Sequence, residues 1–171
     1  MQLSATGLDL IMKSEGFRSH TYLDVAGIPT IGYGHRLLPH ESYPDGIAKT
    51  HARQILSIDV ETSGQAVQRL VKVPLTQGQF DALTSFCFNL GEGRLASSTL
   101  LKALNAGRYD AAREQLLRWD IAAGEICPGL KARREAEFRL WGEAAPPTPA
   151  QEPEPSAVPI STTASLSSAL R

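Results

Sequence analysis

The 171-residue sequence contains little cysteine and no long hydrophobic run. Its two cysteines, Cys87 and Cys127, lack metal-ligand spacing, and its four histidines form no metal-binding motif, so we expect neither a metal nor a cofactor. Nothing marks the chain for export, so we expect reduced thiols, although a disulfide between the two cysteines stays open. The first residues contain no basic segment followed by an apolar one, so we expect neither a signal peptide nor a membrane anchor.

No charge of one sign dominates the chain. The 17 basic and 18 acidic residues leave a net charge of −1, which argues against a dedicated nucleic-acid-binding protein. Basic residues are mildly enriched near the end of the predicted folded part, at Lys131, Arg133, Arg134 and Arg139. We interpret them as a solvent-exposed helix face; the alternative is a basic patch that attracts an anionic partner.

The composition changes abruptly near residue 144. Residues 144–171 hold six of the 11 prolines, no aromatic residue, and many Ser, Thr and Ala. Such a segment cannot bury enough apolar surface to offset the entropy of ordering, so we predict that it is disordered. The sequence thus predicts one folded domain, residues 1–143, and a tail, residues 144–171, which is either inert or a linker to a partner.

The folded part has mainly helical patterns. The segment 47–71 has a sparse apolar stripe, typical of a solvent-exposed bridge between two lobes, and Pro74 ends it. Thr76 and Gln79 form a capping box that opens the next helix, and Gly91 ends that helix. Further helices are predicted near residues 98–105, 110–119 and 129–141.

A glutamate stands at the end of the first predicted helix, which Ser4 or Thr6 caps. Glu15 lies on the same helical face as Leu8, Ile11 and Met12, and Gly16 can end the helix in a left-handed conformation. Burial would favour the protonated form of this carboxyl group, which a general acid requires. The alternative is a helix-terminal glutamate paired with an arginine.

Asp24 stands in a turn signal between two short extended runs, and a turn aspartate often bonds only its own backbone. In the following strand, alternation places Thr30, Gly32 and Gly34 on one face. A face with a hydroxyl group and two glycines lets a ligand approach the backbone closely, although glycine also marks bulges and bends.

The run from Glu15 through Asp24 and Thr30 to Gly32-Tyr33-Gly34-His35 resembles the active-site segment of phage-type lysozymes, glycoside hydrolase family twenty-four. The residues are similar in type and spacing. Later stretches are also similar to endolysins of lambdoid phages, at residues 79–91, 97–107 and 129–141, so that the resemblance covers roughly residues 1–142. It implies an α+β, mainly α fold: a lysozyme-like two-lobed structure with a small β-hairpin lobe and a larger helical lobe joined by a long helix.

The resemblance also implies hydrolysis of the β-1,4 bond between N-acetylmuramic acid and N-acetylglucosamine in peptidoglycan. Glu15 would be the general acid, and Asp24 and Thr30 would hold the attacking water. In such an inverting mechanism the two carboxyl groups stand about 6.5–9.5 Å apart. Phe88, Asn89 and Gly32 would contact the substrate, although Phe88 also fits a core position. His35 would support the fold, not the chemistry.

Two departures from the family pattern concern charges near the acid. Ser14 replaces an acidic residue that precedes the glutamate in the best-known relative. An arginine partners the catalytic glutamate or its neighbour in this family, and the sequence leaves open whether Arg133 or Arg134 does so here.

By this resemblance the protein would be a monomeric endolysin that lyses the host cell. It would accumulate in the host cytoplasm and need a holin to reach the cell wall or periplasm, with peptidoglycan as its substrate. Two alternatives remain: a lytic transglycosylase, which forms anhydro-muramic products, and a non-catalytic wall-binding module.

Overall fold

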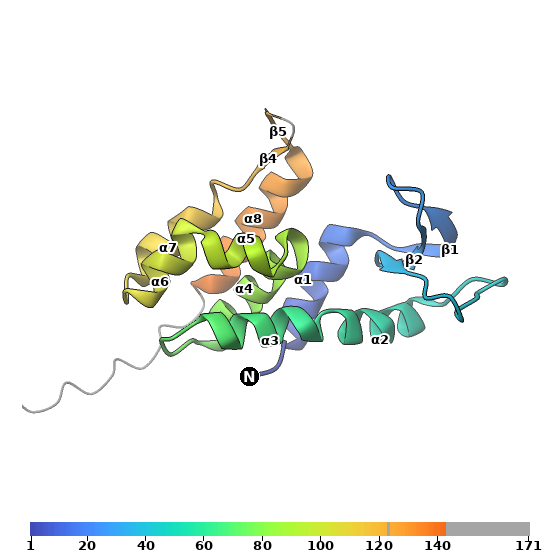
Figure 1. Ribbon diagram of the computed structural model, residues 1–171, viewed down its shortest axis with the longest axis horizontal. Helices are drawn as coiled ribbons and strands as arrows, with labels where there is room; N and C mark the ends of the chain where they lie inside the picture. The colour runs from blue at the N-terminus through green and yellow to red at the C-terminus, as the bar shows by residue number, and fades with distance from the viewer. Residues whose placement is uncertain (123, 143–171) are drawn as a thin grey trace, which may run out of the picture.

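A small antiparallel sheet and a larger group of helices form two lobes, connected by two helices that run along one side of the molecule (Figure 1). The computed structural model describes residues 1–122 and 124–142. The sheet has the strand order β1-β2-β3. The elements are α1 (Ala5–Glu15), β1 (Arg18–Leu23), β2 (Pro29–Gly32), β3 (His35–Arg36), α2 (Lys49–Asp59), α3 (Glu61–Leu70), α4 (Gln77–Leu90), α5 (Glu92–Ser97), α6 (Thr99–Asn105), α7 (Tyr109–Leu116), β4 (Ile121–Ala122), β5 (Glu125–Ile126) and α8 (Pro128–Trp141).

Local capping chemistry sets the ends of α1 and α4. Ser4 caps α1 by accepting a hydrogen bond from the backbone N–H of Gly7. Gly16 ends α1 with φ 73° and ψ 156°, so its φ is positive but its conformation is not left-handed helical. The predicted capping box of Thr76 and Gln79 opens α4, and Gly91 ends it. These boundaries confirm the predictions made from the sequence.

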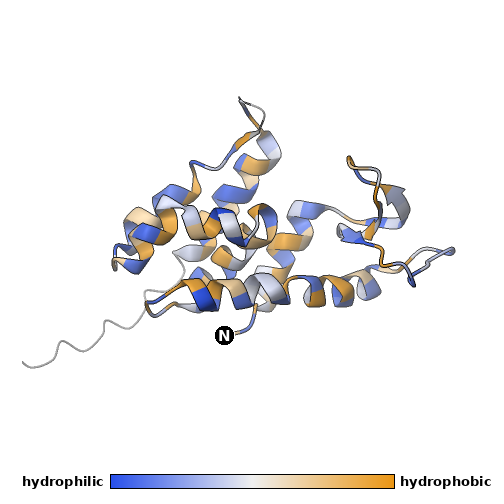
Figure 2. Ribbon diagram, viewed as in Figure 1, coloured by the Kyte–Doolittle hydropathy of each residue, from blue (hydrophilic) through white to orange (hydrophobic). Residues whose placement is uncertain are grey.

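The bridge between the lobes is not one helix. The predicted helix over residues 47–71 is wrong in this detail, because α2 ends at Asp59 and α3 begins at Glu61. Val60 between them keeps right-handed helical angles and is 3% exposed, so the two helices still run nearly end to end (Figure 1). Both mix hydrophobic and hydrophilic residues along their length, as helices with one buried side do (Figure 2).

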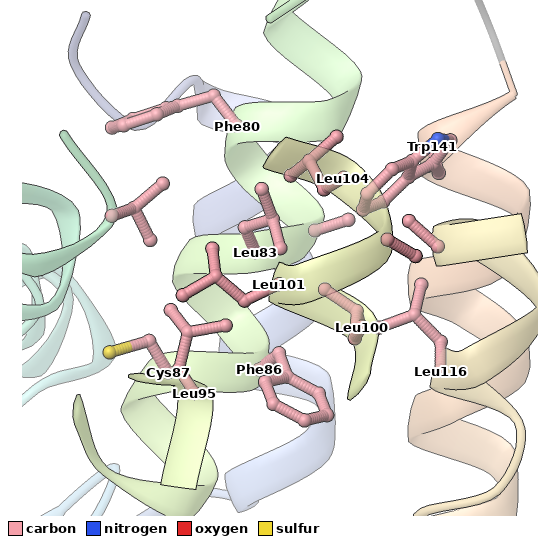
Figure 3. Packing of buried hydrophobic residues seen from close by; sticks show 14 of the residues in the cluster. Phe80, Leu83, Phe86, Cys87, Leu95, Leu100, Leu101, Leu104, Leu116 and Trp141 are labelled. Atoms are coloured by element: carbon pink, nitrogen blue, oxygen red, sulfur yellow. The ribbon is translucent and has the colours of Figure 1, made fainter. Parts of the chain in front are cut away.

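The helical lobe packs around α4. Phe80, Leu83, Phe86 and Cys87 project from this helix into a cluster with leucines of α5, α6 and α7 and with Trp141 of α8 (Figure 3). Phe86 also meets Trp119 edge to face, with ring centroids 5.3 Å apart. This packing fixes α4 and α8 against each other, and both helices carry residues of the candidate site.

The small lobe has its own core, which α1 shares. Ile11 of α1 packs with Ile31 of β2, Tyr33 and Leu56 of α2, and each of these residues is at most 6% exposed. Phe88 of α4 is partly buried against the same cluster, so it packs between the lobes. The α1 helix therefore connects the small lobe to the helical lobe and carries Glu15 at the junction.

Two short elements were not predicted from the sequence, and the predicted tail lies outside the residues that the structure describes. The helix α5 and the hairpin β4–β5 have no strong sequence signal, because each is short.

Cys87 and Cys127 are both free thiols, in agreement with the expectation. In the part of the chain that the structure describes, no helix has the length and apolar character needed to cross a membrane. The predicted tail, residues 144–171, lies outside the described residues.

Candidate active site

The C-terminal end of α1 places Glu15 beside α8. Nη1 of Arg133 donates a hydrogen bond to Oε1 of Glu15 at 2.5 Å, across 118 residues of sequence. The Glu15 side chain is 27% exposed, whereas that of Arg133 is 4% exposed. Glu15 was expected on a buried apolar stripe; instead it lies at the surface, because it occupies the last turn of α1. The alternative interpretation, in which Glu15 pairs with an arginine, is therefore confirmed, and that arginine is Arg133.

The chain between β2 and β3 passes next to this carboxyl group. A Cβ atom placed on Gly34 would lie 3.9 Å from Oε2 of Glu15, so the absence of a side chain at Gly34 keeps that side of the carboxyl group open. Gly32 differs, because a Cβ there would lie 3.1 Å from Cβ of Ala52 and 3.2 Å from Cδ1 of Ile47. The predicted common face of the two glycines is therefore wrong: β2 ends at Gly32, whose φ of 68° breaks the alternation. Substrate contact at the buried Gly32 stays an untested prediction.

Asp24 forms the predicted turn after β1. Its Oδ1 accepts hydrogen bonds from the backbone N–H groups of Ala26 (2.8 Å) and Ile28 (2.9 Å). Its Oδ2 accepts from Nε (3.1 Å) and Nη2 (2.9 Å) of Arg36 on β3. The hydrogen bond from Ile28, together with those from Ala26 and Arg36, holds the pKa of Asp24 below its ordinary value against the opposing effect of desolvation. Asp24 is therefore a turn residue and also a persistent negative charge beside the sheet.

Thr30 lies in the middle strand of that sheet, paired with Tyr22 on β1 and with Arg36 on β3. It is 2% exposed, and its hydroxyl group donates to the carbonyl oxygen of Ile28 at 2.9 Å. This bond uses the hydroxyl hydrogen and leaves the oxygen lone pairs free to accept. Strand pairing thus places Thr30 next to Arg36, which holds Asp24.

A buried charged cluster on α8 holds Arg133, the partner of Glu15. Oε1 of Glu137, which is fully buried, accepts hydrogen bonds from Oγ of Ser85 (2.7 Å) and Nε of Arg133 (3.3 Å), and lies 3.2 Å from Nη2 of Arg134. Arg133 also donates from Nη2 to the carbonyl oxygen of Ser85 at 3.0 Å. The interpretation of Arg133 and Arg134 as solvent-exposed is therefore wrong: they are 4% and 0% exposed and point into the lobe.

Burial dominates the electrostatics of this cluster. Desolvation lowers the pKa of Arg134 to about 10, while the charge of Glu137 acts in the opposite direction. Desolvation also raises the pKa of Glu137, against the neighbouring charges of Arg134 and Arg133. Arg134 remains protonated at neutral pH and needs Glu137 as its counter-ion.

The last turn of α4 carries the two other predicted substrate contacts. Oδ1 of Asn89 accepts a hydrogen bond from Nη2 of Arg134 at 2.9 Å. Both Asn89 and Phe88 are partly exposed, and Phe88 packs against the small-lobe cluster. Phe88 therefore packs partly in a hydrophobic core, as its alternative interpretation expected. Substrate contact by Phe88 or Asn89 stays a prediction.

His35 lies between two carboxylates, those of Glu41 and Asp59. Its Nδ1 is 2.9 Å from Oδ2 of Asp59 at the end of α2, and its Nε2 is 2.9 Å from Oε2 of Glu41. Burial alone would lower the pKa of His35, but the hydrogen bonds and charges of Glu41 and Asp59 together raise it. The residue ties β3 to α2 and to the loop between them, which agrees with the expected role in the fold.

The sequence reasoning missed three residues of this region. Arg36 contacts Asp24, and Ser85 contacts Arg133. Glu137 contacts both Arg133 and Arg134. None of the three was predicted as a site residue. Glu137 had a usable signal, because it follows Arg133 by four positions and Arg134 by three, the spacings of ion pairs on one helix face. Ser85 gave no such signal.

The chain is similar in sequence to known proteins. The sequence matches the Phage lysozyme family over residues 12–137. It is 38% identical over 144 residues to the endolysin of Salmonella phage P22, covering 82% of this chain and 98% of that relative. It is 41% identical over 144 residues to the endolysin of Bacillus phage B103, covering 82% of this chain but only 54% of that protein. The chain therefore spans about half the length of the B103 relative.

A solved structure shares the fold. The muramidase domain of SpmX from Asticaccaulis excentricus superimposes with a TM-score of 0.76 at 33% identity, covering 84% of this chain and 99% of that domain. The predicted lysozyme-like α+β fold is thereby confirmed.

Proposed function

Because the chain belongs to the phage lysozyme family, we propose that it is an endolysin that hydrolyses the β-1,4 bond between N-acetylmuramic acid and N-acetylglucosamine in bacterial peptidoglycan. The contrast between Glu15 and Asp24 carries the proposal. Asp24 receives backbone N–H groups and a guanidinium group, which keep it ionised, whereas Glu15 projects from a helix end next to Gly34. Two carboxyl groups in different environments are what acid-assisted glycoside hydrolysis needs.

In the proposed reaction, Glu15 gives its proton to the glycosidic oxygen as the bond to the sugar breaks. A water molecule attacks the anomeric carbon from the opposite face, and its proton passes to Asp24 as the new C–O bond forms. The lone pairs of the Thr30 hydroxyl group accept a hydrogen bond from this water. The product sugar has the inverted anomeric configuration, and this geometry requires the two carboxyl groups to leave room for the water.

Arg133 orients Glu15 before the proposed reaction and stabilises its charge afterwards. The guanidinium group fixes the direction of the Glu15 side chain before substrate binds. After the proton leaves, it stabilises the Glu15 carboxylate, so the charge that forms during bond cleavage has a cation already in place.

The variant Glu15→Gln tests the acid assignment. It keeps the size of the side chain and the hydrogen bond from Arg133 but has no proton to give. We expect a fall in the initial rate of peptidoglycan hydrolysis of at least about hundredfold, with an unchanged circular dichroism spectrum. Activity within about tenfold of wild type would exclude Glu15 as the general acid.

The cellular role follows from the same assignment. The proposed role is lysis of the host from within: the protein accumulates in the cytoplasm as a monomer, and a holin opens the route to the cell wall. Expression without and with a holin tests this route, since only the second culture should lyse.

A further inference from the structure

Arg134 is an unexpected residue for the interior of a small protein. It is fully buried with its Cζ 4.9 Å from the ring centroid of Phe86, and its Nε and Nη1 have no hydrogen-bond partner among the described residues. Its polar contacts run to two side chains, the buried Glu137 and the partly exposed Asn89. A buried cation is costly, and hydrophobic packing would fill the same space. The contact with Asn89 is the one that reaches the surface.

The donor and acceptor chemistry of this contact fixes the orientation of the Asn89 side-chain amide. A guanidinium group can only donate hydrogen bonds, so the oxygen of Asn89 must face Arg134. The NH₂ group of Asn89 then points the other way. Glu137 fixes Arg134 in turn, since its Oε1 lies 3.2 Å from the same Nη2 atom that donates to Asn89.

Helix packing puts Asn89 at the same end of the lobe as Glu15. Gly7 of α1 lies against Asp81 of α4, since a Cβ on Gly7 would be 2.8 Å from Cγ of Asp81. Glu15 and Asn89 stand eight positions after Gly7 and Asp81, respectively (15 − 7 and 89 − 81). Arg133 contacts both Glu15 and Ser85, so α1 and α4 advance in the same direction. The two adjacent arginines of α8 therefore hold one residue each at this end.

We propose that Arg134, together with Glu137, is a positioning residue that presents the NH₂ group of Asn89 to the glycan. The site then offers a hydrogen-bond donor at this point, and the matching substrate group is an acceptor. The carbonyl oxygen of an acetamido group is the strongest neutral acceptor on such a glycan. This inference rests on the proposed function and assigns the buried cluster a part in substrate binding.

The variant Asn89→Asp separates the donor from the structural contact. The carboxylate accepts a hydrogen bond from Arg134 at least as well as the amide does, but it cannot donate to substrate. We expect a melting temperature equal to or above that of wild type and a kcat/KM on peptidoglycan at least tenfold lower, mainly through a higher KM. Activity within threefold of wild type would overturn the proposal, because a purely structural Asn89 tolerates this change.

A double-mutant cycle tests whether Arg134 acts through Asn89. We expect Arg134→Met to lower kcat/KM at least threefold in the wild-type protein and to change it less than 1.5-fold in the Asn89→Ala background. An equal loss in both backgrounds would mean that Arg134 only supports the fold, and would contradict the proposal. If Arg134→Met does not fold, the comparison of Asn89→Asp with wild type decides alone.

The experiment distinguishes this inference from the proposed function. Wild-type protein that releases no peptidoglycan fragments would remove the proposed function and, with it, the inference. An active wild-type protein with an equally active Asn89→Asp variant would remove the inference alone.

Discussion

Nη1 of Arg133 contacts Oε1 of Glu15 at 2.5 Å and joins the end of α1 to the buried face of α8. The same guanidinium group donates to Glu137 and to the backbone of Ser85, so its position is set by three partners before any substrate arrives. Glu15 is thus a surface carboxyl group that a buried cation orients. Arg133 therefore affects both the stability of the fold and the proposed activity of Glu15.

Removal of Arg133 should destabilise the protein. Arg133→Met leaves Glu137 with one cation fewer in a fully buried site, and we expect the free energy of unfolding to fall by about 3 kcal/mol. Urea denaturation measures the change. Lys131→Met, an exposed position on the same helix, is the matched control and should stay within about 0.5 kcal/mol of wild type. Equal effects of the two substitutions would show that Arg133 is not held as described.

Loss of the Asp24 charge should slow hydrolysis at acidic and neutral pH alike. Backbone N–H groups and Arg36 hold the pKa of Asp24 below its ordinary value, so its carboxylate remains charged at about pH 5. We expect Asp24→Asn to lower kcat by about hundredfold at both about pH 5 and about pH 7. Asp45→Asn, at an exposed loop position, should retain wild-type kinetics. An Asp24→Asn variant as fast as wild type would remove Asp24 from the mechanism.

Stability should depend on the protonation of His35. Glu41 and Asp59 raise the pKa of His35 in the folded state. The contribution of charged His35 is therefore fully present below its unfolded pKa of about 6.5 and is lost as the pH rises through the higher folded value. We expect His35→Asn to destabilise the protein more at about pH 6 than at about pH 9 in urea denaturation. His51→Gln, at an exposed position of α2, should show no such difference.

The local sequence predicts much of this fold but little of its long-range pairing. Ser4 and Thr76 each bond to a backbone N–H group three residues later in the chain. The starts of α1 and α4 could therefore be predicted from the local sequence. The break at Val60 was not, because Val60 keeps helical angles and no proline or exposed glycine marks it. The burial of Arg133 and Arg134 depends on Glu15, Ser85 and Asn89, which lie 45 to 118 positions away.

The tail can be tested separately from the site. Its composition predicts no docking on the folded domain, so a chain that ends after Gly142 should melt within about 2 °C of the full chain. Thermal unfolding followed by circular dichroism measures this difference. A decrease of more than a few degrees would show that residues 143–171 pack against the folded part.

The most direct test of the central claim is mass spectrometry of purified peptidoglycan digested by wild type and by Glu15→Gln. The account predicts fragments with hydrated N-acetylmuramic acid reducing ends from wild type and none from the variant. Fragments lighter by one water molecule would instead identify a lytic transglycosylase. An absence of fragments from both proteins would leave a wall-binding module and contradict the account.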